Sequence, residues 1–309
     1  MSGRILVTGA RGFIGRSLCS RLERDGLDVV RATRTPVPGG GDLEAPELGP
    51  NADWSSLLSG ADIVIHLAGR AHVISEKASP SVEEDYHRIN AAGTSRLARQ
   101  AREAGVRQII FLSSCHAVAS ESDIELTRST APYPSSAYGR SKLEGERALA
   151  EVLDGSSTGW TVLRPPLVYG PGNLANFRRL ITLVRSGLPL PFGSVCNRRS
   201  FIGVDNLADI ISCCIGNKNA HERIYFPCDG DPVSTPELVR KIARALGKPD
   251  RVFSVPELWL KTISQLPGLD VLRKLMASLF VSPQGLHEDL GWTPPLTLEQ
   301  GLSMINHQA

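Results

Sequence analysis

Short runs of apolar residues alternate along this chain with longer segments in which apolar residues recur every three or four positions. The runs are rich in Val, Ile and Leu, which is typical of strands buried on both faces. They predict strands at residues 4–8, 28–32, 62–67, 108–113, 160–164 and 223–227. The periodic segments predict helices at residues 12–25, 82–104, 138–153, 204–217 and 235–247. Because strands and helices alternate, we expect an α/β fold with a parallel sheet and right-handed crossovers.

Three segments depart from this alternation. Residues 35–50 are rich in proline and glycine, which indicates a loop inside one domain. Residues 173–194 and 229–309 are more irregular than the rest of the chain. A chain of 309 residues is long enough to bury one large core, or a core and a small second lobe.

Three glycines follow the first predicted strand at every third position: Gly9, Gly12 and Gly15. A strand, a glycine turn and a helix in this order are typical of a dinucleotide-binding site. Gly9 permits a tight turn, Gly12 lets the backbone approach phosphate oxygens, and Gly15 lets the helix pack close to the strand. The amide groups and the dipole at the helix N-terminus would then bind a pyrophosphate.

A phenol and an ammonium group lie one helical turn apart in a later helix. Tyr138 and Lys142 are four residues apart, so both side chains project from the same face. A nearby ammonium favours the phenolate, and we expect Lys142 to lower the pKa of Tyr138. Tyr138 would then be a general acid or base for an alcohol or ketone. Ser114, at the end of the strand predicted at 108–113, would stabilise the charge that develops on the same oxygen.

The end of the second predicted strand carries basic residues. In many sites that bind NAD, a carboxylate at this point binds the ribose 2′-hydroxyl. Here Asp28 stands at the start of the strand, and Arg31 and Arg34 occupy its end. A guanidinium favours a 2′-phosphate through a charge-assisted pair. We therefore expect NADP(H) in preference to NAD(H), with Arg34 as the better candidate ligand.

Composition narrows the possible functions. The net charge of +2 gives no indication of binding to nucleic acid or to an acidic membrane surface. Because no N-terminal apolar stretch resembles a signal peptide and no apolar run is long enough to span a bilayer, we expect neither a signal peptide nor a membrane span. Six cysteines have no metal-ligand spacing, so we expect no metal site and reduced, packed thiols in a cytoplasmic protein. We also expect His66 and Trp292 to be packing residues.

These motifs, with others along nearly the whole chain, resemble those of extended short-chain dehydrogenases/reductases in the nucleotide-sugar epimerase/dehydratase group. The resemblance implies a Rossmann-like, doubly wound parallel sheet with a smaller C-terminal substrate-binding lobe. The NAD(P)-binding domain would comprise residues 1–172 and about 195–228, and the lobe residues 173–194 and 229–309. The matching segments are residues 8–15, 62–69, 90–94, 111–114, 138–142, 163–172, 199–209 and 290–294.

The resemblance also implies roles for individual residues. Asp42 and Leu43 would contact the adenine, Lys142 would hold the nicotinamide ribose, and Arg199 would bind the nucleotide diphosphate. With Arg34, the expected cofactor-binding residues are Gly9, Gly12, Phe13, Ile14, Gly15, Asp42, Leu43, Leu67, Ala68, Gly69, Asn90, Tyr138, Lys142 and Pro165. The expected substrate-binding residues are Ser114, Asn173, Asn176 and Arg199.

Three reactions share this Ser–Tyr–Lys chemistry in the group that the chain resembles. A 4,6-dehydratase has an acidic pair directly after the serine or threonine, whereas Cys115 and His116 follow Ser114 here. A 4-epimerase oxidises C4 and returns the hydride to the other face of the sugar, generally with NAD. A 4-keto reductase accepts hydride once from NADPH, and the basic strand end favours this reaction.

We therefore expect a C4 reductase of a UDP-4-keto-6-deoxy-N-acetylhexosamine, of the UDP-N-acetylquinovosamine or fucosamine type, in surface-polysaccharide synthesis. A UDP-glucose or UDP-N-acetylglucosamine 4-epimerase is the alternative. A further alternative is a regulator that binds NADP without turnover, but such proteins commonly lack the Tyr or the Lys, and both are present here. The resemblance also implies a homodimer formed through the helices at 82–104 and 138–153.

Overall fold

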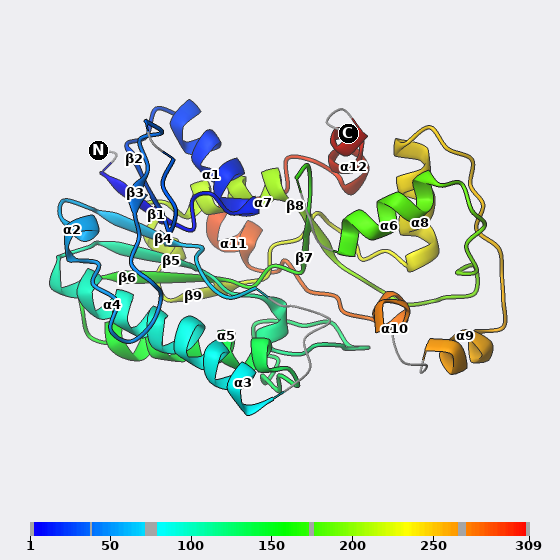
Figure 1. The fold of residues 1–309 in the computed structure, drawn as a ribbon, viewed down its shortest axis with the longest axis horizontal. Coiled ribbons are helices and arrows are strands. Elements are labelled where there is room, and N and C mark those ends of the chain that lie inside the picture. Colours follow the sequence, from blue (N-terminus) through cyan, green and yellow to red (C-terminus); the bar gives the residue numbers. More distant parts are fainter. Residues whose placement is uncertain (1–2, 38, 72–78, 173–175, 265–269, 307–309) are drawn as a thin grey trace.

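A seven-stranded parallel sheet forms the centre of the molecule. The computed structural model describes residues 3–37, 39–71, 79–172, 176–264 and 270–306. The strands are β1 (Ile5–Thr8), β2 (Val29–Thr33), β3 (Leu43–Glu44), β4 (Ile63–His66), β5 (Gln108–Leu112), β6 (Gly159–Leu163) and β9 (Arg223–Tyr225). Their order in the sheet is β3-β2-β1-β4-β5-β6-β9, and every neighbouring pair is parallel (Figure 1). The order reverses between β1 and β4, which is where doubly wound sheets bind their ligands.

Helices cover both faces of this sheet (Figure 1). On one face lie α1 (Phe13–Arg24), α7 (Val204–Cys214) and α11 (Leu286–Leu290), and on the other α2 (Ser55–Leu58), α4 (Gly93–Glu103) and α5 (Ala137–Leu153). Successive strand residues point to opposite faces, so Ile5 and Val7 pack with the first set and Leu6 packs with the second. Each face therefore has its own apolar core.

The helix expected at residues 82–104 is present but is not uniform. It consists of α3 (Pro80–Tyr86), a π-helical turn (His87–Ala92) and α4. The π-helical turn contains Asn90, one of the expected cofactor-binding residues. Such turns are rare, and proteins use them frequently at functional sites.

A second lobe lies beside the carboxyl ends of the central strands (Figure 1). It is built on the two-stranded parallel sheet β7 (Leu167–Tyr169) and β8 (Phe201–Gly203). Apolar residues such as Phe177, Leu238 and Leu302 form its core. Its helices are α6 (Asn176–Arg185), α8 (Thr235–Ala245), α9 (Glu257–Ser264), α10 (Asp270–Met276) and α12 (Leu298–Asn306). Within the described ranges, no helix is both long and apolar enough to cross a membrane.

The structure confirms the fold class and all the predicted strands and helices, and it adds several elements. Strands β3, β7 and β8 are only two or three residues long, too short to produce a recognisable apolar run. Helix α6 lies in a segment expected to be irregular. Leu286 and Trp292, which fall in the range expected for the lobe, pack instead into the core beneath α1 and α7.

All the cysteines are free thiols, but Cys196 is exposed, so the expectation that every thiol is packed was wrong.

Candidate active site

The glycine turn between β1 and α1 has the geometry of an anion-binding site. Gly9 has a φ of 70°, a left-handed conformation that favours glycine. A Cβ on Gly15 would collide with backbone carbonyls and lie 2.7 Å from the Ala10 oxygen, so close approach of α1 requires glycine there. Gly12 is the N-cap residue of α1, which has no side-chain cap and no acidic residue in its first turn. Its first amide groups therefore face outward with a positive dipole end, and they fit a pyrophosphate.

Polar contacts shape the neighbouring edge after β4. The Thr8 hydroxyl accepts a hydrogen bond of 3.2 Å from the Ala68 amide. Asn90 accepts one of 2.8 Å from the Arg70 amide and donates one of 3.1 Å to the Arg70 carbonyl. A Cβ on Gly69 would lie 2.8 Å from Asn90 Oδ1 and 3.5 Å from Lys142 Nζ. Gly69 and Asn90 thus lie close to Lys142. Pro165 is buried, and its carbonyl accepts a hydrogen bond from the Cys115 amide.

The basic residues at the end of β2 have different environments. Arg31 is held by two hydrogen bonds to Glu23, one of 2.6 Å. Asp42 is buried and forms an ion pair with Arg11, while Leu43 is exposed on β3. Arg34 is exposed, and no acidic group of the described chain lies within ion-pair distance of it. Of the two arginines at the strand end, Arg34 is therefore the one available to a ligand.

Ser114, Tyr138 and Lys142 come together where β5 ends against α5. Ser114 hydrogen-bonds to the Tyr138 phenol. Lys142 is buried, donates a hydrogen bond of 2.9 Å to the Leu112 carbonyl and lies over the Phe111 ring. The helix brings the phenol and the ammonium to one face, as their spacing predicts.

The expected lowering of the Tyr138 pKa is not observed. Burial raises the pKa of Tyr138 to about 12, and the hydrogen bond from Ser114 only partly opposes that rise. Burial also lowers the pKa of Lys142 to about 8. The prediction missed this because it considered the attraction between two groups and not the cost of desolvating each of them. At neutral pH the phenol is therefore protonated.

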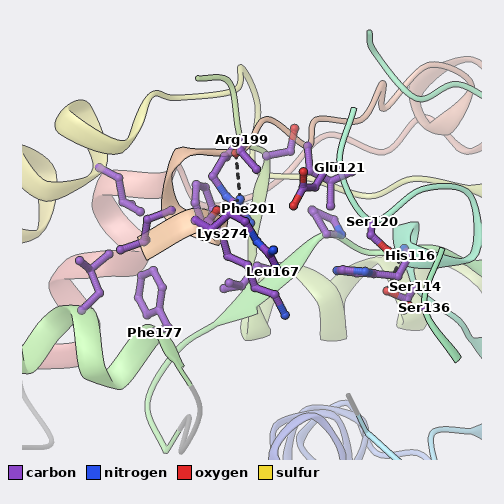
Figure 2. A pocket seen from close by; sticks show the side chains of 18 of the residues that line it. Ser114, His116, Ser120, Glu121, Ser136, Leu167, Phe177, Arg199, Phe201 and Lys274 are labelled. Carbon is purple, nitrogen blue, oxygen red and sulfur yellow. Dashed lines mark hydrogen bonds between the residues drawn. The ribbon is translucent and has the colours of Figure 1, made fainter. Parts of the chain in front are cut away.

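A cavity of about 530 Å³ extends from these residues into the second lobe. Figure 2 shows Ser114 and His116 at one end, Phe177 at the other and Arg199 between them. Arg199 donates hydrogen bonds of 2.5 Å to the Lys274 carbonyl and 3.0 Å to the Ala277 carbonyl, and burial lowers its pKa. The cavity is also lined by three further cationic residues, Arg179, Arg273 and Lys274, and by the acidic residue Glu121.

The structure does not test two of the expected substrate contacts. Asn173 lies outside the described residues, and the side chain of Asn176 is not described, although Asn176 begins α6. The sequence analysis did not predict that Arg179 on α6 and Arg273 and Lys274 on α10 line the cavity. No sequence motif relates residues that lie so far apart in the chain. In the part of the chain that the structure describes, no group of three metal-ligating side chains occurs.

The two residues interpreted as packing residues are both in the core. His66 is 1% exposed, contacts the hydroxyls of Thr8 and Thr94, and stacks on Phe111. Trp292 is 6% exposed and donates a hydrogen bond of 2.8 Å to Asp209. Burial lowers the pKa of His66 to about 3, so its imidazole is neutral and has no role as a cation.

Comparisons with known proteins agree with this geometry. A profile of the NAD dependent epimerase/dehydratase family matches residues 5–226. A UDP-glucose 4-epimerase from Vibrio cholerae is 37% identical over 308 residues, which cover 97% of this chain and 94% of that protein. The structure of MoeE5 in complex with UDP-glucose and NAD is 25% identical, with a TM-score of 0.79 over 99% of this chain and 98% of that one. A UDP-N-acetylglucosamine 4-epimerase from Bacillus cereus, 19% identical, has the same fold, with a TM-score of 0.80 over 99% of both chains.

Proposed function

The chain belongs to the NAD dependent epimerase/dehydratase family, and we propose that it reduces the C4 ketone of a UDP-4-keto-6-deoxy-N-acetylhexosamine, in surface-polysaccharide synthesis. The observation that carries this proposal is the cavity, which is lined by Ser114 and Tyr138 at one end and by the buried Arg199 between its two ends. The sheet domain would bind the cofactor and the second lobe the sugar nucleotide, with the residues expected from the sequence.

The proposed catalytic residues can carry out this reduction. A nicotinamide cofactor, when bound, supplies the hydride for C4. Tyr138, whose pKa burial raises from 10 to about 12, is protonated at neutral pH and donates its proton to the ketone oxygen. Ser114 hydrogen-bonds to the same oxygen, and the Lys142 ammonium stabilises the phenolate that remains.

The charges around the cavity suit a sugar nucleotide. A diphosphate carries negative charge, and Arg199 is a buried guanidinium that presents several donors in a fixed plane. Arg179, Arg273 and Lys274 surround the same space and add positive charge. The MoeE5 complex contains UDP-glucose, and its likeness to this chain supports a UDP-sugar as substrate.

We further propose NADPH as the preferred reductant. Arg34 is exposed at the end of β2 with no acidic partner among the described residues, and it would pair with a 2′-phosphate. Glu23 occupies the Arg31 guanidinium, so Arg34 alone of these two would make that contact.

A 4-epimerase that acts on UDP-glucose or UDP-N-acetylglucosamine is the second candidate. The relative from Vibrio cholerae, 37% identical to this chain, is a UDP-glucose 4-epimerase. Both reactions require proton transfer at the C4 oxygen by the same Ser–Tyr–Lys residues, so the geometry of these three does not separate them.

The decisive experiment follows the cofactor and the sugar together. The enzyme is incubated with UDP-4-keto-6-deoxy-N-acetylhexosamine, UDP-glucose or UDP-N-acetylglucosamine, each with NADPH or NADH, and products are identified by NMR. A reductase consumes one reduced cofactor per product molecule. Interconversion of two UDP-hexoses without net cofactor change would identify the epimerase, and turnover of no UDP-sugar would exclude both.

Two further expectations stay proposals. We propose a homodimer formed through the outward faces of the helices within 82–104 and 138–153, and light scattering of the purified protein measures its mass. We also propose that the protein is cytoplasmic, and cell fractionation tests this location.

A further inference from the structure

Three residues of α5 contact three consecutive residues at the end of β5. Tyr138, Lys142 and Glu146 follow one another at intervals of four, so they form one stripe along the helix. Tyr138 bonds to Ser114, Lys142 bonds to the Leu112 carbonyl, and Glu146 accepts a hydrogen bond from the Ser113 hydroxyl. The first two belong to the proposed catalytic machinery, and the third has no assigned role.

Glu146 also forms a buried ion pair with Arg164, the residue that follows β6. Their side chains are 4% and 5% exposed. Arg164 Nε donates to both carboxylate oxygens at 3.0 and 3.1 Å, and its Nη2 donates to one of them at 2.5 Å. The Arg164 amide is itself fixed by a bond of 2.7 Å to the Tyr225 carbonyl on β9. One carboxylate on α5 is thus held by β5 and by the end of β6, which is in turn bonded to β9.

Burying two charges carries a desolvation cost that a well-packed apolar pair would avoid. Stability alone is therefore a weak reason for an ion pair at this place. Glu146 lies one helical turn beyond Lys142, and this position suggests that the ion pair serves the reaction.

We infer that Glu146, held by Arg164 and Ser113, is a positioning residue that fixes α5 against β5 and β6 and keeps Lys142 in its charged form. The inference rests on the proposed function, in which the Lys142 ammonium stabilises the Tyr138 phenolate. An ammonium buried against strand backbone tends to lose its proton, and a carboxylate one helical turn away opposes that loss.

The groups that face Lys142 support this assignment. On α5 this group is Glu146, on β4 it is the neutral His66, and after β6 it is Arg164, which pairs with Glu146. Burial lowers the pKa of Lys142, and Glu146 raises it. Among these neighbours, Glu146 is thus the one anionic group that helps Lys142 to keep its proton. The surrounding Phe111 ring and Leu112 carbonyl carry no net charge.

The test compares two glutamates on the same helix. Glu146→Gln keeps the shape of the side chain and removes its charge. Glu144→Gln removes an equal charge from the outer face of the helix, where the Glu144 side chain is 44% exposed and hydrogen-bonds to His87. The turnover number with the UDP-4-keto sugar is measured against pH, and the Lys142 ammonium is titrated directly by NMR in protein labelled with ¹³C at lysine Cε. The Lys142 signal is identified by its loss in Lys142→Met.

In Glu146→Gln we expect the alkaline limb of the profile and the Lys142 titration to move together to lower pH by about one unit. In Glu144→Gln neither should move by more than about 0.2 unit, because solvent screens exposed charges. Ser113→Ala removes a hydrogen bond to Glu146 but no charged group, so it should lower turnover without moving either curve. A Lys142 titration unchanged in folded Glu146→Gln would overturn the inference.

A second variant covers the case in which Glu146→Gln leaves Arg164 as an unpaired buried charge and the protein fails to fold. Glu146→Gln/Arg164→Met removes both charges and keeps an apolar stem in place of the guanidinium. If the pair is only structural, this folded double variant titrates as the wild type does; if the inference is correct, Lys142 again titrates at lower pH. The NMR titration needs no substrate, so it gives a result even if the proposed reaction is wrong.

Discussion

The Lys142 ammonium donates a hydrogen bond of 2.9 Å to the carbonyl oxygen of Leu112, at the last residue of β5. This contact turns the ammonium toward the strand backbone and holds it inside the protein. The strand therefore fixes the position of the Lys142 ammonium, and burial lowers its pKa more than Glu146 raises it.

Replacing Tyr138 by phenylalanine tests its role as the proton donor. Tyr138→Phe removes the hydroxyl that bonds to Ser114 and should lower the turnover number by about 10²- to 10⁴-fold, the usual contribution of a general acid. Binding of NADPH, measured by its fluorescence, should be unchanged. Tyr133→Phe is the matched control, because Tyr133 is 88% exposed, and it should keep full activity. Near-normal turnover in Tyr138→Phe would contradict the assignment.

The proposed preference for NADPH rests on Arg34. Arg34→Ala should raise the Kd of NADPH about tenfold or more, since a charge-assisted bond to the 2′-phosphate is lost. The Kd of NADH should hardly change. Arg24→Ala is the control. It removes an exposed cation at the C-terminal end of α1, away from the glycine turn, and should change the Kd of neither cofactor. An equal loss for both cofactors in Arg34→Ala would rule out a contact with the 2′-phosphate.

Arg199 should govern the affinity for the sugar nucleotide. Arg199→Met removes a buried guanidinium from the cavity and should raise the KM for the UDP-sugar about 100-fold, with a smaller effect on the turnover number. Arg198→Ala is the control, because the neighbouring side chain lies outside the cavity, over the Phe280 ring. It should change KM by less than about threefold. Similar KM values for both variants would argue against a diphosphate contact at Arg199.

The buried His66 predicts how stability depends on pH. Its pKa is about 3 in the folded protein, against an ordinary value of 6.5, because burial disfavours the charged imidazole. Below pH 6.5 the unfolded chain gains a proton at His66 and the folded chain does not. This contribution to stability is therefore complete above pH 6.5 and is lost as the pH falls toward 3.

Between pH 7.5 and pH 5 the free energy of unfolding should fall by about 2 kcal/mol more in the wild type than in His66→Gln, which has no group to titrate there. Urea denaturation at the two pH values measures this difference. His66→Gln should be less stable at pH 7.5, since it disturbs the contacts with Thr8 and Thr94. Parallel losses in the two proteins would show that His66 does not remain neutral.

The sequence predicted the sheet, the helices that flank it and the Ser114, Tyr138 and Lys142 site, because these depend on local patterns. A strand–glycine–helix order and an interval of four residues both specify geometry within a few turns of chain. The lobe was predicted only in outline. Its strands are three residues long, and its helices acquire an apolar environment only when they pack together.

Some properties were decided only by the tertiary structure, because they depend on distance and on burial rather than on order along the chain. The sequence placed two arginines at the end of β2, but the fold pairs Arg31 with Glu23 and leaves Arg34 exposed. The sequence paired a phenol with an ammonium, but desolvation raises the pKa of Tyr138. Glu146 and Arg164 are 18 residues apart and carry no motif, and their ion pair exists only because β6 brings the arginine beneath α5. The sequence therefore determined which side chains occur at each strand end and helix face. The packing of the tertiary structure determined their protonation states and their partners.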